Sequence, residues 1–177
     1  MPTINFEFKA KANEIAALEK KLLTLLPDYI GEDKQVDTYF NVATGRLKLR
    51  EGNIENSLIF YERTNTAGAK QSDILLYHHS PDGALKDILI KLHGLKVVVD
   101  KKRKIYFIGN VKFHFDLVEG LGTFVEVEAI DHNDSIGIDK LKEQCNYYAA
   151  FFNIQPSDFI AFSYSDMIIE KKRQNSS

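Results

Sequence analysis

The sequence is short of the residues on which many small scaffolds and metal sites depend. Its 177 residues include a single cysteine, Cys145, which excludes an internal disulfide and a zinc site built from several cysteines. The thiol lies at helical spacing among apolar residues, so we expect it to be buried and unreactive. No stretch approaches the roughly 18 apolar residues of a membrane-spanning helix, and the first residues lack the apolar core of a signal peptide. We therefore expect a soluble, cytoplasmic protein with no membrane partner.

A surplus of one charge is missing as well. The 23 lysines and arginines are balanced by 25 acidic residues, so there is no overall positive field to attract nucleic acid, and we expect no nucleic-acid partner. Residues 65–72 form a polar stretch with a glycine and a lysine, but they lack the GxxxxGK[ST] spacing of a phosphate-binding loop. His78, His79 and His93 are not at the spacing of metal ligands, and we interpret them as surface or edge histidines.

What the sequence does contain is a series of segments in which apolar and polar residues alternate, the pattern of half-buried strands. Segments with helical spacing interrupt them. Asn13 and Ser80 are the expected N-caps of the first two helices, which Pro27 and Gly94 should end. The expected strands are 3–11, 35–42, 46–51, 57–64, 73–79, 95–108, 111–118 and 123–129. The expected helices are 13–27, 80–94, 135–153 and 157–172. We predict one domain over residues 1–170, with a frayed tail at 171–177.

One expected strand, RLKLRE, places Arg46, Lys48 and Arg50 on one face and Leu47 and Leu49 on the other. Taken alone, this pattern is typical of a sheet with one face in water. The question is why three cations follow one another along a single face.

The same charge segregation recurs in other strands. Charged faces are also formed by Glu7 with Lys9, by Lys112, His114 and Asp116, and by Glu126 with Glu128. Two architectures fit: a sheet whose charges meet bulk water, or a closed or nearly closed barrel of about eight strands with helices outside and the charges in a hydrated tunnel. Arginine and lysine are concentrated on some of these faces and glutamate on others, which favours the barrel. The strand at 95–108 carries charges on both faces, so alternation leaves its orientation open.

Charges inside a barrel are costly unless water, an oppositely charged ligand and metal ions compensate them. Arginine and lysine bind phosphate oxygens, whereas carboxylates hold Mg²⁺ or Mn²⁺ through hard oxygen ligands. The pattern therefore predicts a polyanionic ligand accompanied by divalent cations.

The sequence resembles the CYTH superfamily, the triphosphate tunnel metalloenzymes, over nearly its whole length. NFEFK is similar to the opening ExExK signature of the family, with Asn5 in place of the first glutamate. DTYFN followed by GRLKLRE resembles the cationic strand of the family. The block KKRKIYFIGNVKFHFDLVEGLGTFVEVE is the most specific match and resembles the class IV adenylyl cyclase branch.

The resemblance implies a set of site residues. Substrate binding is implied for Lys9, Arg46, Lys48, Arg50, Arg63, Lys101 and Arg103. A catalytic role is implied for Lys9 and Asp116, and Mg²⁺ or Mn²⁺ binding for Glu7, Glu126 and Glu128. Ser163 and Tyr164 are similar to a Ser-Tyr pair near the tunnel mouth.

The implied activity takes two forms. The enzyme would convert ATP to cyclic AMP and pyrophosphate, or it would hydrolyse thiamine triphosphate or tripolyphosphate. The amide of Asn5 removes one negative charge near the metal ion, so a non-catalytic nucleotide- or polyphosphate-binding module remains an alternative, as does a scaffold with solvated charges. A homodimer is compatible with the resemblance.

Overall fold

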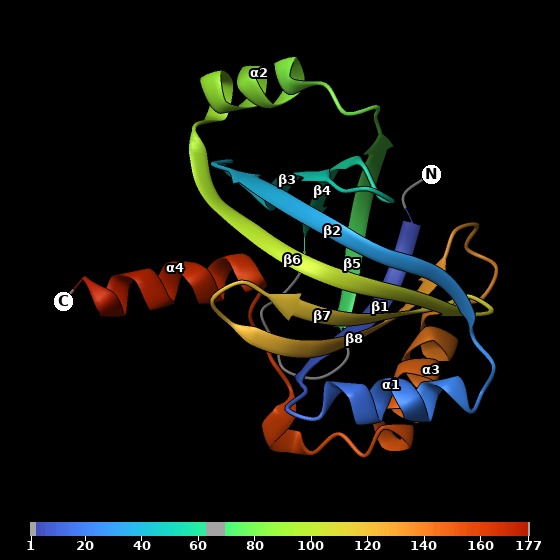
Figure 1. Cartoon of the computed structure of the whole chain (residues 1–177). Helices are drawn as coiled ribbons and strands as arrows, with labels where there is room; N and C mark the ends of the chain where they lie inside the picture. The colour runs from blue at the N-terminus through green and yellow to red at the C-terminus, as the bar shows by residue number, and fades with distance from the viewer. Residues whose placement is uncertain (1–2, 63–69, 177) are drawn as a thin grey trace.

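A closed antiparallel barrel forms the body of the protein (Figure 1). The computed structural model describes residues 3–62 and 70–176. Within this part, eight strands follow the order β1-β5-β4-β3-β2-β6-β7-β8, and β8 pairs back with β1. The strands are β1 (Thr3–Lys11), β2 (Asp28–Phe40), β3 (Arg46–Glu51), β4 (Ser57–Glu62), β5 (Lys70–His78), β6 (Leu95–Ile108), β7 (Val111–Val118) and β8 (Gly122–Asp131). The predicted fold class, an α+β barrel with helices outside, is confirmed.

Strand bounds agree best with the predictions where alternation is clean and turns are marked. The bounds of β3, β6 and β7 coincide with the predicted ones. Gly109 ends β6 at a φ of 57°, a conformation that glycine adopts at little cost in a tight turn. Two expectations were wrong: β2 begins at Asp28 rather than at residue 35, and residues 70–72, expected in a loop, belong to β5.

The helices are α1 (Ile15–Leu23), α2 (Gly83–His93), α3 (Ile138–Phe151) and α4 (Tyr164–Asn175), with a 3-10 turn at Pro156–Asp158. The predicted N-caps were wrong. Glu14 precedes α1 without a side-chain cap, and Asp82 caps α2 by accepting a hydrogen bond from the backbone N–H of Ala84 at 2.9 Å. The predicted helix at 157–172 starts only at Tyr164, and α4 continues past residue 170.

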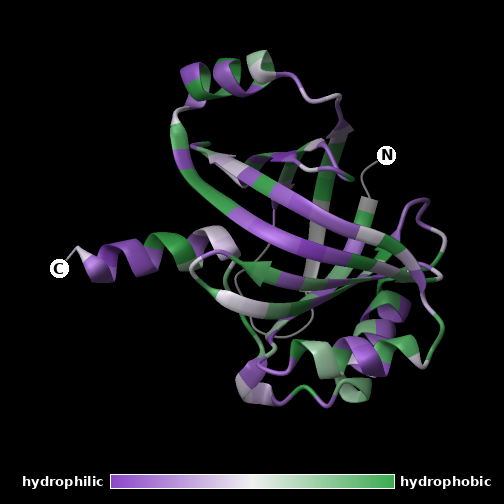
Figure 2. Cartoon of the chain, in the orientation of Figure 1, coloured by the Kyte–Doolittle hydropathy of each residue, from purple (hydrophilic) through white to green (hydrophobic). Residues whose placement is uncertain are grey.

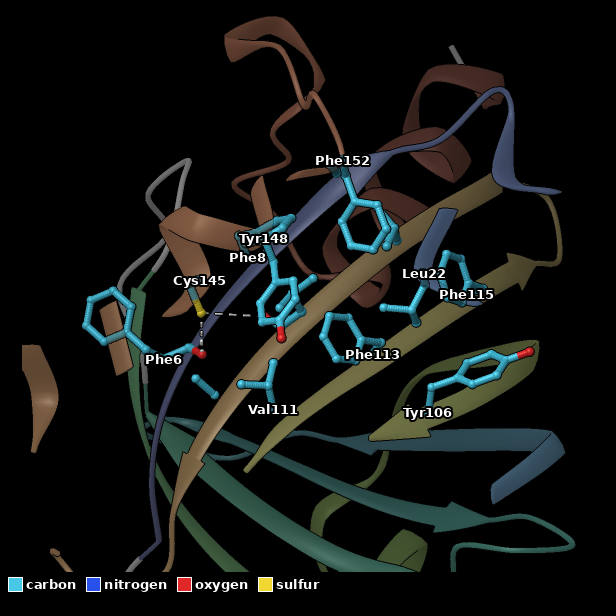
Figure 3. Packing of buried hydrophobic residues seen from close by; sticks show 14 of the residues in the cluster. Phe6, Phe8, Leu22, Tyr106, Val111, Phe113, Phe115, Cys145, Tyr148 and Phe152 are labelled. Carbon is cyan, nitrogen blue, oxygen red and sulfur yellow. Dashed lines mark hydrogen bonds between the residues drawn. The ribbon is translucent and has the colours of Figure 1, made fainter. Parts of the chain in front are cut away.

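The main hydrophobic core lies outside the barrel, between the outward faces of β1, β7 and β8 and the helices α1 and α3 (Figure 3). Phe113 is fully buried and packs edge-to-face against Tyr148 of α3. The thiol of Cys145 donates a hydrogen bond to the carbonyl oxygen of Phe6 at 3.0 Å, and burial raises its pKa to about 12. The predicted buried thiol is confirmed, and its neutral form dominates at neutral pH.

Because apolar side chains face the outer helices, polar side chains are left for the interior of the barrel. The central parts of β2 and β6 are hydrophilic (Figure 2). The charged strand faces therefore point into the barrel, and of the two architectures that fit the sequence, the closed barrel is the one that forms. In the described part of the chain, no helix has both the length and the apolar composition needed to cross a membrane.

Candidate functional site

The inward faces of the strands enclose a cavity of about 950 Å³. Eight of the predicted site residues line it, namely Glu7, Lys9, Lys48, Arg50, Lys101, Arg103, Glu126 and Glu128. The wall also includes Ser163 and Tyr164 at the start of α4. The strand whose orientation alternation left open, β6, directs Lys101 and Arg103 inward.

Two of the predicted residues lie elsewhere in the described structure. Arg46 pairs with Asp166 of α4 at 2.8 Å and is not part of the cavity wall. Asp116 is fully buried behind Arg103. Arg63 lies outside the described residues.

The first cationic group is organised around Asp37 of β2, which is 1% exposed. Arg50, its cross-strand neighbour on β3, donates from Nε and Nη2 to the two carboxylate oxygens at 2.8 and 2.9 Å. Lys101 of β6 and Lys48 of β3 donate to Oδ2 at 2.8 and 3.2 Å. Glu55 accepts from Nη1 of Arg50 at 3.0 Å. Three cations from two strands are thereby gathered on one carboxylate.

The second cationic group repeats this geometry on the other side of β6. Arg103 donates from Nε and Nη2 to its cross-strand neighbour Asp116 at 2.7 and 2.6 Å. Nη2 also donates to Glu126 at 2.7 Å. The hydroxyl of Tyr164 donates to Asp116 at 2.7 Å. Both arginines are thus held edge-on by an aspartate, the bidentate arrangement that fixes a guanidinium most firmly.

The carboxylates of β8 form the facing wall with the inward residues of β1. Glu126 forms an ion pair with Lys9 at 3.2 Å and contacts Nδ1 of His114 at 3.2 Å. Glu128 accepts a hydrogen bond from the side-chain amide of Asn5. The Lys9 ammonium also lies 3.8 Å from the centre of the Tyr164 ring. Cations and carboxylates therefore meet at Lys9 and Glu126.

Burial and mutual charge shift the protonation of these groups. Burial, reinforced by the nearby Arg50, Arg103 and Lys48 cations, lowers the pKa of Lys101 to about 7 against the opposing effect of Asp37. Burial also tends to raise the pKa of Asp37, but Arg50, Lys101 and Lys48 together hold it well below its usual value. Asp37 is therefore ionised at neutral pH, whereas Lys101 titrates near it.

The histidine in this wall stays neutral at pH 7. Burial and the charge of Arg103 lower the pKa of His114 to about 4, although its contact with Glu126 favours the protonated ring. Its Nε2 atom is buried without a hydrogen-bond partner.

Divalent metal binding can be tested against the same wall. Among the described residues, no group of three or more histidine, cysteine or acidic side chains could hold a metal ion by itself. However, Oδ1 of Asn5 is buried without a hydrogen-bond partner. Burial, with Glu7 and Glu126 nearby, raises the pKa of Glu128 despite the opposing Lys112 charge and Asn5 hydrogen bond. Mg²⁺ is commonly held by one or two carboxylates together with substrate phosphates. The donors therefore fit a metal ion that arrives with a phosphate ligand.

Four cavity residues that bond to the charged groups of the site are absent from the predicted set: Asp37, Glu55, Lys112 and His114. Lys112 and His114 share the face of Asp116 in the alternation pattern, and this signal was sufficient to find them. Glu55 lies in the β3–β4 loop, where no strand periodicity applies. Its carboxylate is bound by the nearby Arg50 and by Lys112 of β7, and the contact with Lys112 forms only when the barrel is folded.

A family model for the CYTH domain matches residues 3–150. No curated protein is similar in sequence at a significant level. Among solved structures, the PH1012 protein of Pyrococcus horikoshii has 23% identity and a TM-score of 0.77, with 92% of this chain and 98% of that chain covered.

Two further similar structures bear functional descriptions. A candidate adenylate cyclase from Vibrio parahaemolyticus has 15% identity and a TM-score of 0.76, covering 93% of this chain and 97% of that one. A candidate adenylyl cyclase from Hippeastrum, described as having a dominant triphosphatase activity, has 13% identity and a TM-score of 0.62, covering 97% and 96%. At these identities the likeness establishes the shared fold.

Proposed function

Because the chain belongs to the CYTH domain family, we propose that it is an enzyme that acts on a triphosphate compound with the help of Mg²⁺ or Mn²⁺. The observation that carries this proposal is the convergence of cations on one cavity of a closed barrel, facing a wall of carboxylates. A triphosphate has several negative charges along a short chain, and preorganised cations stabilise both its binding and the charge that develops during phosphoryl transfer.

The proposed phosphate-binding residues are Lys9, Lys48, Arg50, Lys101 and Arg103. Lys9 pairs with Glu126 where the cations meet the carboxylates, so we assign it the catalytic contact with the phosphoryl group that is transferred. Asp116 is fully buried and bound to Arg103 and Tyr164. We therefore propose that it orients Arg103 rather than touching the substrate. Arg46, the first residue of β3, is paired with Asp166 of α4 and would contact the far end of the ligand.

The proposed metal-binding residues are Glu7, Glu126 and Glu128, with Oδ1 of Asn5 as a further oxygen donor. When bound, a divalent ion would neutralise charge on the phosphate oxygens and polarise the phosphorus. Arg103 and Lys9 already hold Glu126 in place, so this carboxylate is ordered before a metal ion arrives.

The cavity offers more than phosphate contacts. Its β4–β5 wall contributes the apolar side chains of Ile59 and Leu76. This surface favours a triphosphate that bears an organic group, such as ATP or thiamine triphosphate, over tripolyphosphate. Two outcomes then depend on the nucleophile. A ribose 3′-hydroxyl in line with the α-phosphorus gives cyclic AMP and pyrophosphate, whereas a water molecule at the γ-phosphorus gives phosphate.

A second candidate function, a non-catalytic nucleotide- or polyphosphate-binding module, is favoured by Asn5. Its neutral amide donates to Glu128, and the wall has one negative charge fewer than a glutamate would give it. Such a module would be stabilised against heat by the triphosphate without forming product.

The proposal is tested by incubating the protein with ATP, thiamine triphosphate and tripolyphosphate, each with Mg²⁺ or Mn²⁺. Cyclic AMP, pyrophosphate and phosphate are measured, together with the melting temperature. Metal-dependent product supports the enzyme, and stabilisation without product supports the binding module. If none of the three compounds gives product or raises the melting temperature, both the enzyme and the binding module are refuted.

Replacing Asn5 by glutamate tests the metal-binding wall. Asn5→Glu adds a buried negative charge beside Glu128, so the melting temperature without metal should fall. A further charged ligand should tighten Mn²⁺ binding by about tenfold, and Mn²⁺ should then raise the melting temperature of the variant more than that of the wild type. Calorimetry and thermal shift measure both effects. Asn41→Glu, at an exposed position after β2, is the control, and an equal response of the two variants to Mn²⁺ would place Asn5 outside the metal site.

A further inference from the structure

Asp37 has the hydrogen-bonding pattern of a bound anion, although it belongs to the protein. Its carboxylate accepts four hydrogen bonds, two from Arg50 and one each from Lys101 and Lys48. The side chain is 1% exposed and lies near the C-terminal end of β2, between the two strands that contribute these cations. Although Asp37 lines the cavity, both of its carboxylate oxygens are already bonded to these cations.

We propose that Asp37 is a positioning residue that holds Arg50, Lys48 and Lys101 in a binding-competent arrangement before the triphosphate arrives. This inference rests on the proposed function, because the arrangement of the three cations affects ligand binding only if they bind phosphate. Without Asp37, the positive charges of Lys48 and Arg50 on β3 and of Lys101 on β6 would face one another across β2 and would repel.

The orientation of Arg50 supports this role. Its Nε and Nη2 atoms are engaged by Asp37, and Nη1 is engaged by Glu55. The guanidinium plane is therefore fixed, and its remaining N–H groups are free of these two carboxylates. A fixed guanidinium loses little conformational entropy when it binds a phosphate. The equivalent pair, Arg103 with Asp116, shows that the same device occurs twice in the barrel.

Asp37 also controls how much of Lys101 is protonated. The charged groups that face Lys101 are Asp37 of β2, Lys48 and Arg50 of β3, and Arg103 on β6 itself. On β7 its register partner is the apolar Val118, and the Tyr164 hydroxyl of α4 binds Asp116. Asp37 is the anion that opposes the effect of burial, so its removal should lower the pKa of Lys101 below its present value of about 7.

The first test does not depend on any ligand. In the Asp37→Asn variant, the Nε–H of Arg50 should lose its ordered NMR signal and exchange with solvent at least tenfold faster. Arg103 is an internal control, because its Nε remains bound to Asp116. Equal protection of Arg50 in the variant and the wild type would overturn the proposal. If Asp37→Asn does not fold, the smaller Asp37→Ser variant is measured in the same way.

The second test measures tripolyphosphate binding by calorimetry without metal, from pH 6 to pH 9. Asp37→Asn should bind at least tenfold more weakly at pH 8, and its affinity should decline at lower pH than in the wild type because Lys101 loses its proton earlier. Asp100→Asn, an exposed aspartate on β6, should match the wild type. Unchanged or tighter binding by Asp37→Asn would refute the positioning role. Absence of binding by the wild type would refute the proposed function instead, and the NMR result would then decide the role of Asp37 alone.

Discussion

Arg50→Ala is expected to lower triphosphate turnover by about 10²–10³-fold, the usual effect of removing one preorganised donor to a developing negative charge. Arg50 is 7% exposed and lies in the cavity wall, where Asp37 and Glu55 fix its guanidinium. The loss should appear in kcat as well as in KM, because charge on the phosphate oxygens increases at the transition state. Steady-state kinetics with the best substrate measure both constants.

The fold should survive this substitution. Asp37 keeps its bonds to Lys48 and Lys101, and Glu55 keeps its bond to Lys112, so neither carboxylate is left buried without a cation. Arg50→Lys retains the charge but cannot form the bidentate contact, and an intermediate rate is expected. Arg173→Ala, on the exposed end of α4, is the matched control. Wild-type rates for both Arg50 variants would remove this residue from the site.

Much of the barrel could be predicted because it depends on local alternation. The bounds of β3 and β7 followed from apolar residues at every second position, and Gly109 marked the turn before β7. The start of α4 carried an overlooked signal. Ser163 and Asp166 form a capping box, in which each side chain bonds to the backbone of the other. The apolar residues before it suggested a longer helix, but Phe159 pairs with Ala10 of β1 instead.

The candidate site was predicted as a set of charged faces rather than as contacts. Alternation identifies which residues share a face, and so it identified Lys48 and Arg50 together. It carries no information on which carboxylate neutralises them. Asp37 and Lys101 are 64 positions apart in sequence and become neighbours only because β2 pairs with β6. Pairings of this kind depend on strand order, which a single sequence does not specify.

Asp116 illustrates the same limit in a different way. Its position in the pattern placed it on the inward face, and the resemblance implied a catalytic role. The structure shows that Arg103 and Tyr164 occupy its oxygens, so its face was predicted correctly while the proposed role changes. The depth of a side chain behind its neighbours depends on packing in three dimensions.

Glu126→Gln is the second change with a large expected effect. The substitution keeps the size of the side chain and removes the charge that faces Lys9, Arg103 and the proposed metal ion. We expect turnover to fall by at least about 10²-fold and Mn²⁺ binding in the presence of tripolyphosphate to weaken by about tenfold. Arg103 keeps its two bonds to Asp116, so the barrel should remain folded. Glu119→Gln, exposed in the β7–β8 turn, is the control. A metal-binding role for Glu126 requires that turnover and Mn²⁺ affinity both fall. If turnover falls while Mn²⁺ affinity is unchanged, Glu126 orients Lys9 and Arg103 instead of binding the metal ion.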